Sequence, residues 1–175
     1  ATRCCPAPRQ NPAHSIEPLL AALRTAATAA GGRLSVLDFG GALGSTWWQH
    51  RRQLAAVPEV RWSVVEQPGF VTAGRREFST GPLRFYETCE ACHAAERPNV
   101  VLLSSVLPYV ERPHALLADL AAHECDWIII DRTGLTRTGR DRLTVEHVPP
   151  SIYDASYPCW FFDRARLLAS LPPHW

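Results

Sequence analysis

Residues 34–44 read Leu-Ser-Val-Leu-Asp-Phe-Gly-Gly-Ala-Leu-Gly, an apolar run that passes through Asp38 into a glycine-rich turn. Residues 45–56 continue with the spacing of a helix. Glycines between a buried strand and a helix allow positive φ angles and let the backbone pass close to a ligand. The stretch therefore predicts the first strand and the first ligand-binding turn of an α/β sheet.

Further segments on both sides of this stretch repeat the alternation of strand and helix. Apolar runs occupy residues 61–66, 83–87, 99–104 and 126–131, and helical patterns occupy 68–78, 89–96 and 113–124. The runs are apolar nearly throughout, which is typical of parallel strands buried on both faces. We predict a Rossmann-like, doubly wound parallel sheet with strand order 3-2-1-4-5. Its ligand site should lie at the carboxyl ends of the strands, between the first and the fourth.

The N-terminal part predicts a leader followed by a helix. Residues 1–14 contain three prolines and little apolar periodicity, so we expect a flexible leader that adds nothing to the fold. Ser15 is expected to cap a helix that carries Pro18 in its first turn and ends at Gly31 and Gly32. Residues 15–175 are predicted to form a single domain with a truncated C-terminus.

Composition excludes several classes of function. A chain of 175 residues with 46% hydrophobic content suits one globular domain, and a net charge of +1 disfavours nucleic acid as the main ligand. No apolar run approaches the roughly 20 residues of a membrane-spanning helix, and no signal peptide is recognisable. These features predict a cytoplasmic protein without a membrane span, in which most of the six cysteines are free thiols.

Acidic residues stand at the ends of several predicted strands. Asp38, Glu66 and Asp131 do so, and Glu87 is a further candidate. Glu66 follows Gly44 by 22 residues, a spacing suited to a carboxylate that accepts hydrogen bonds from both ribose hydroxyls of a nucleoside. The dinucleotide fingerprint would need glycine where Phe39 stands, and a phosphate-binding P-loop would need a lysine after Gly44. NAD is therefore the weaker cofactor hypothesis, and nucleoside triphosphate hydrolysis is excluded.

Five ordered motifs resemble a bacterial family of class I S-adenosylmethionine-dependent methyltransferases, some of whose members are associated with cell-surface polysaccharide loci. The resemblance extends over about residues 15–171. The motifs are VLDFGGALG at 36–44, VVEQP at 64–68, LLSSVLPYVERP at 102–113, IIIDRT at 128–133 and VPPSIYDASYPCWFF at 148–162.

This resemblance implies S-adenosylmethionine as the cofactor. Four residues, Asp38, Gly40, Gly41 and Gly44, resemble the motif that wraps its methionine part. Glu66 resembles the residue that binds its ribose, with Gln67 adjacent, and Ser104 and Ser105 lie where such enzymes line cofactor and acceptor. The commonest form of the first motif has glycine where this chain has Ala42.

A second departure concerns the end of the chain. Class I methyltransferases usually finish with an antiparallel pair of strands, whereas the helix expected at 163–171 is followed here only by Pro-Pro-His-Trp. We therefore expect the C-terminal β-hairpin to be missing, with residues 141–148 forming a short extra strand or an arm over the site. An exposed sheet edge predicts self-association with another chain or reduced stability.

The resemblance implies methyl transfer to a small-molecule or saccharide-related acceptor. Proximity and orientation would supply most of the acceleration, and Asp131 and His147 are the candidates for taking a proton from a hydroxyl acceptor. A structural ion pair with Arg132 is the favoured alternative for Asp131. The alternative function is a non-catalytic relative that binds a nucleoside or a partner protein, and a NAD-linked enzyme is a third hypothesis.

Other conspicuous residues carry weaker hypotheses. The string Cys89-Glu-Ala-Cys92-His93 matches a haem-attachment pattern, but coincidence is favoured over haem, zinc or a redox dithiol, and no metal site is predicted. Trp47 and Trp48 are expected to pack in the core, one of them nearer the rim. The aromatic segment 153–162 is interpreted either as part of the acceptor pocket or as a hydrophobic cover. His50 and His93 are minor candidates for a base.

Overall fold

The computed structural model describes residues 12–175, with side chains from Pro18 onward. Most of the predicted leader, residues 1–11, lies outside the described part. Helix α1 spans Pro12–Ala29, so Ser15 lies inside it and Pro18 is an interior residue. The expectation of a helix capped by Ser15 was therefore wrong, because the helical backbone begins at Pro12, four residues before the position that this capping pattern indicated.

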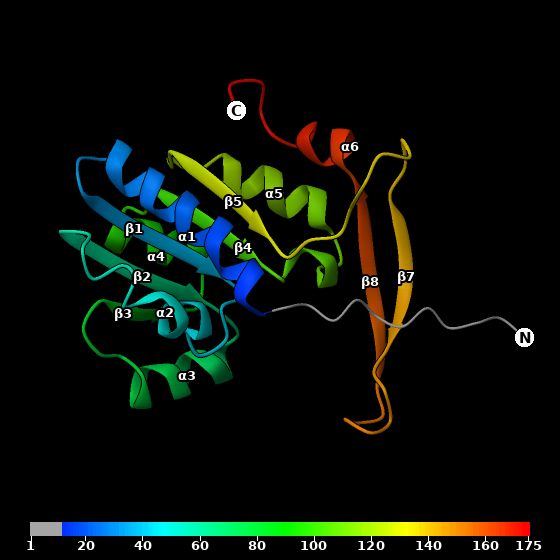
Figure 1. The fold of residues 1–175 in the computed structure, drawn as a ribbon, viewed down its shortest axis with the longest axis horizontal. Helices are drawn as coiled ribbons and strands as arrows, with labels where there is room; N and C mark the ends of the chain where they lie inside the picture. Colours follow the sequence, from blue (N-terminus) through cyan, green and yellow to red (C-terminus); the bar gives the residue numbers. More distant parts are fainter. Residues whose placement is uncertain (1–11) are drawn as a thin grey trace, which may run out of the picture.

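A parallel sheet of five strands forms the centre of the fold (Figure 1). Its order is β3-β2-β1-β4-β5, which confirms the predicted topology. The strands are β1 (Arg33–Phe39), β2 (Glu59–Val65), β3 (Leu83–Tyr86), β4 (Val100–Ser104) and β5 (Trp127–Asp131). The connecting helices are α2 (Ser45–His50), α3 (Pro68–Glu77), α4 (Cys89–Glu96) and α5 (Pro113–Ala121). None of the described helices is long and apolar enough to cross a membrane.

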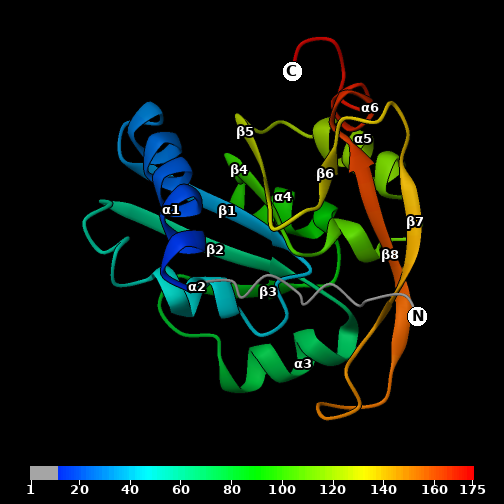
Figure 2. The same cartoon turned by 45° about the vertical axis from the view of Figure 1, so that its right-hand side comes forward.

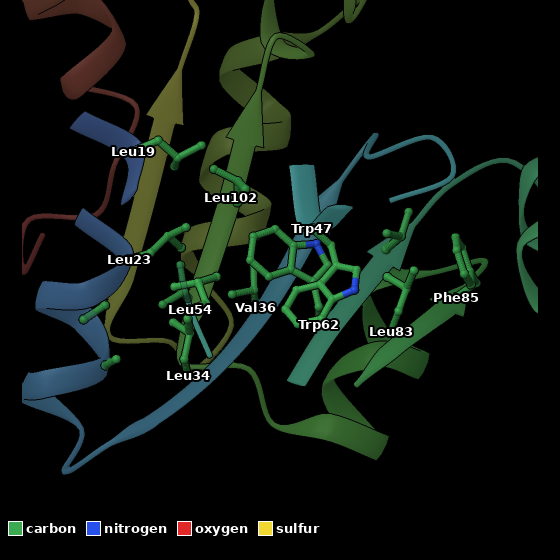
Figure 3. Packing of buried hydrophobic residues seen from close by; sticks show 14 of the residues in the cluster. Leu19, Leu23, Leu34, Val36, Trp47, Leu54, Trp62, Leu83, Phe85 and Leu102 are labelled. Carbon is green, nitrogen blue, oxygen red and sulfur yellow. The ribbon is translucent and has the colours of Figure 1, made fainter. Parts of the chain in front are cut away.

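Alternate residues of the buried strands build two separate cores. Leu34 and Val36 of β1 face a core shared with α1 and α2, while Leu37 points to the opposite core under α5. Figure 3 shows Trp62 of β2 against Trp47 of α2 in the first core, with ring centroids 5.8 Å apart. Burial on both faces explains why the strands read as continuous apolar runs.

A second, smaller sheet follows the main one in the chain. It has the order β6-β8-β7, from β6 (Leu135–Thr136), β7 (Arg142–His147) and β8 (Ser156–Asp163), and α6 (Arg164–Leu168) comes after it. Strands β7 and β8 pair antiparallel from Arg142 opposite Phe161 to His147 opposite Ser156. The expectation of a missing hairpin was thus incomplete: a hairpin exists, but it precedes the last helix and is separate from the main sheet.

The hairpin stands across the carboxyl ends of the parallel strands (Figures 1 and 2). It contacts the main body through η1 (Leu107–Tyr109), the short 3₁₀ turn that follows β4. In the described part of the chain β5 pairs with β4 alone, so its other edge is unpaired. Self-association through this edge stays a prediction.

Candidate functional site

A cavity of about 550 Å³ lies at the carboxyl ends of β1, β2 and β3. Its apolar walls come from the strand ends and from the segment around η1, and its charged walls are carboxylates. The lining residues are Phe39, Gly40, Val65, Glu66, Gln67, Pro68, Glu87, Val106, Tyr109 and Val110. Of the predicted site residues, Gly40, Glu66 and Gln67 thus lie at one cavity.

Glu66 joins the glycine turn to the end of the second strand. Its Oε1 accepts a hydrogen bond from the Ala42 backbone N–H at 3.3 Å, and its Oε2 accepts one from the Gln67 N–H at 2.7 Å. Each carboxylate oxygen has two lone pairs, so both can still accept from a ligand. The predicted convergence of the glycine turn and Glu66 is therefore present in the structure.

The turn itself requires glycine for two physical reasons. Gly40 and Gly44 have φ angles of +68° and +82°, in the region that favours glycine. A Cβ on Gly40 would also lie 2.5 Å from Cγ2 of Val106, so Val106 packs directly against the glycine backbone. Ala42 adopts a φ of +50°, which costs roughly 1–2 kcal/mol for a residue with a side chain.

Asp38 lies behind the turn and does not line the cavity. Its side chain is 1% exposed and accepts a hydrogen bond from Nε1 of Trp62 at 3.0 Å. Burial raises the pKa of its carboxyl to about 7, although the bond from Trp62 opposes the rise. Gly41 packs directly against this carboxyl. The structure thus places Asp38 and Gly41 as a buried support for the turn.

Ser104, Ser105 and Asp131 form a polar cluster at the ends of β4 and β5, outside the cavity lining. Ser104 donates to Oδ2 of Asp131 at 2.8 Å and accepts from Nη2 of Arg132 at 2.8 Å. Arg132 also pairs with Asp131 at 3.3 Å, and Ser105, at a φ of +61°, donates its N–H to the Asp131 carbonyl. These contacts favour the structural ion pair for Asp131. Its assignment as a base stays a prediction.

His147 lies at the end of β7, opposite Ser156, and is exposed. The neighbouring residue Glu146 accepts a hydrogen bond from the Tyr109 hydroxyl at 3.1 Å. Because successive side chains of a strand point to opposite faces, His147 points away from Tyr109. His147 does not line the cavity, so the structure brings neither predicted base to the cavity wall.

Sequence reasoning missed the residues that close the cavity. Val106, Tyr109 and Val110 line it from the segment after β4, and Glu146 reaches Tyr109 from a position 37 residues away in the sequence. The only signal for Tyr109 was its place just after a strand end. Nothing local in the sequence indicates its contact with Glu146.

The aromatic segment is divided between the second core and the side of the cavity, and its place in an acceptor pocket stays a prediction. Phe162 is fully buried in the second core, with Trp160 packed against it, so this end covers the sheet. Tyr157 instead meets Tyr109 edge to face, with ring centroids 5.4 Å apart, beside the cavity. Tyr153 is exposed.

The other residues singled out in the sequence are packed against other parts of the fold. Trp47 is buried and Trp48 is half-buried, as expected. Burial raises the pKa of the thiols of Cys89 and Cys92 to about 11 and about 12, which keeps them protonated. His93 stacks on His123, and buried His50 bonds the Thr46 carbonyl oxygen at 2.8 Å. Within residues 18–175, no group of three metal-ligating side chains could hold an ion.

Comparison with known proteins identifies the fold. No family model and no curated protein matches the chain. Among solved structures, it is similar to SAM-bound CalS10 of Micromonospora echinaspora, an amino pentose methyltransferase, with a TM-score of 0.56 and 10% identity over 97% of this chain and 89% of that one. The SAH-bound N-terminal domain of EvdMO1 matches with a TM-score of 0.55 and 20% identity, over 93% of this chain and 70% of that one. Human N-acetylserotonin methyltransferase in complex with SAM matches with a TM-score of 0.52 and 14% identity, over 90% of this chain and 45% of that one. The chain has the Rossmann-like fold of the class I methyltransferases.

Proposed function

We propose that this protein is an S-adenosylmethionine-dependent methyltransferase that acts on a small-molecule or saccharide-related acceptor. The observation that carries the proposal is the cavity at which Gly40 and Glu66 meet, since it joins a glycine turn to an acidic strand end. Its position in a fold shared with SAM- and SAH-bound proteins supports the same function. The motifs at 36–44 and 64–68 add the resemblance to a methyltransferase family of which some members are associated with cell-surface polysaccharide loci.

The residues present fit this cofactor. A volume of about 550 Å³ lies within the roughly 300–1,000 Å³ of typical small-molecule sites. Glu66 provides two carboxylate oxygens with free lone pairs, which suits the vicinal hydroxyls of a ribose. Gly40 lines the cavity with backbone alone, and a side chain there would clash with Val106. Asp38 and Gly41 would hold the turn from behind, and Gln67 would contribute at the rim.

The chain would act mainly by binding and orientation. The cofactor supplies a methyl group that is already activated on a sulfonium, so the reaction needs little acid-base help. Glu66 and the backbone of the turn would fix the donor, while Phe39, Val65, Val106 and Val110 form apolar walls that exclude water. Holding donor and acceptor in line then lowers the barrier. Asp131 and His147 stay candidates for a base, should the acceptor be a hydroxyl.

Removal of the Glu66 carboxylate should weaken cofactor binding. We expect Glu66→Ala to lose about 1–3 kcal/mol of affinity for S-adenosylhomocysteine, because the hydrogen bonds of a partly buried carboxylate disappear. Calorimetric titration measures this loss. Glu77→Ala is the matched control, since Glu77 is an exposed residue of α3 that pairs only with neighbouring Arg76 in the described structure. Its affinity should equal that of the unaltered protein.

Parallel titrations separate the competing functions. A methyltransferase should bind S-adenosylmethionine and its demethylated product but show no saturable heat with NAD or NADP. Tight binding of adenosine alone, without discrimination for the sulfonium compound, would favour the non-catalytic nucleoside-binding alternative. If folded protein binds neither cofactor form, or if Glu66→Ala binds as tightly as the unaltered protein, the proposal is rejected.

A further inference from the structure

The charged walls of the cavity have a single sign. Glu66 and Glu87 line it, whereas among residues 18–175 no arginine or histidine does. Glu66 is tied to the backbone of the turn, but Glu87 is exposed at the end of β3 and has no hydrogen-bond or ion-pair partner in the described part of the chain. A cleft lined by charges of one sign concentrates ligands of the opposite sign. The cavity therefore favours cations.

A third carboxylate stands where the hairpin meets the cavity. Tyr109 lines the cavity, is 47% exposed, and donates its hydroxyl hydrogen to Oε2 of Glu146. The Tyr157 and Tyr109 rings pack in a T-shaped arrangement with an interplanar angle of 81°. The hydrogen bond uses one lone pair of Glu146, so the carboxylate retains further acceptor capacity. An aromatic ring and a carboxylate are thus held side by side beside the cavity.

We propose that Tyr109 and Glu146 form a recognition site for a positively charged amine group of the acceptor. An ammonium group is attracted both by the face of an aromatic ring and by a carboxylate. The inference rests on the proposed methyltransferase function and names the class of its acceptor, a small molecule that carries an amine. Glu146 is here a specificity-determining residue, and Glu66 serves the cofactor.

A pair of probes of equal shape tests this inference on the whole protein. Choline carries a quaternary ammonium, and 3,3-dimethyl-1-butanol is its neutral isostere. Titrations followed by NMR, with and without saturating S-adenosylhomocysteine, should give choline an affinity at least about tenfold higher than that of the isostere. Glu146→Gln should remove most of this preference while the affinity for S-adenosylhomocysteine is unchanged.

Glu111→Gln provides the matched control. Glu111 is an exposed carboxylate two residues after Tyr109 that does not line the cavity, so its removal changes the net charge without changing the proposed site. Choline should still be preferred by this variant. Equal affinities for the two probes, no saturable choline binding, or an equal loss in both variants would overturn the inference. Failure of the methyltransferase proposal is recognised separately, by the absence of S-adenosylhomocysteine binding.

Discussion

Replacing Asp38 with asparagine should make the protein more stable at neutral pH and abolish a large pH dependence. Burial raises the pKa of Asp38 from 3.8 to about 7 in the folded state. Between these values the folded state binds more protons than the unfolded state, so the free energy of unfolding falls as pH rises. The total decrease, complete above about pH 7, is about 4 kcal/mol. Asparagine avoids it because it is neutral and its Oδ1 can accept from Trp62.

Urea unfolding of both proteins at a series of pH values between about 4 and 8 measures this effect. The stability of the unaltered protein should fall relative to Asp38→Asn across this range and level off at its upper end. Asp119→Asn removes an exposed carboxylate of α5 and should follow the unaltered protein. A difference between the Asp38 variant and the unaltered protein that does not vary with pH would show that the buried carboxyl is not protonated near neutrality.

A methyl group at position 41 should be the most damaging small change in the glycine turn. In Gly41→Ala the new Cβ would lie 2.6 Å from both Cγ and Oδ2 of Asp38, so the turn or the buried carboxyl must move. Overpacking of this kind costs about 1–3 kcal/mol, and we expect the upper end because Asp38 is fully enclosed. The same shift should weaken S-adenosylhomocysteine binding, since the turn forms a wall of the cavity.

Gly69→Ala is the control for this prediction. A Cβ on Gly69 would meet nothing within 4 Å, and the residue lies in α3, where alanine is favoured over glycine by about 0.5–1 kcal/mol. Chemical denaturation of both variants compares them directly. Gly41→Ala should unfold at lower urea concentration than the unaltered protein and Gly69→Ala at an equal or higher one. An unaltered midpoint for Gly41→Ala would refute the tight packing of the turn on Asp38.

The parallel sheet could be predicted because each of its strands and helices can be recognised from its own residues. Strands such as Val100–Ser104 are buried on both faces and therefore read as apolar runs, and the intervening helices supply the alternation. Strand β8 could not be recognised in the same way. It contains Pro158, which is unusual inside a sheet, and its aromatic residues are divided between the second core and the hairpin. Its pairing with β7 closes over residues 148–155, a connection much longer than a two-residue hairpin turn.

The candidate site was predictable only where neighbouring strand ends meet. Gly40 and Glu66 converge because β1 and β2 are adjacent and parallel, which the strand order already implied. Asp38 was expected at the ligand, but strand alternation places it on the side of Leu34 and Val36, facing the buried core. The alternation that places Asp38 on this side of β1 can be seen in the sequence. The contact of Tyr109 with Glu146 depends on where the hairpin docks, which no local pattern encodes.

A crystal structure of the complex with S-adenosylhomocysteine tests directly whether the glycine turn and Glu66 bind the cofactor. We expect the adenosyl group to occupy the cavity that Gly40, Glu66 and Val106 line, with both ribose hydroxyls within hydrogen-bonding distance of the Glu66 carboxylate. Density for the ligand at another face of the molecule, or a ribose held by residues other than Glu66, would contradict it.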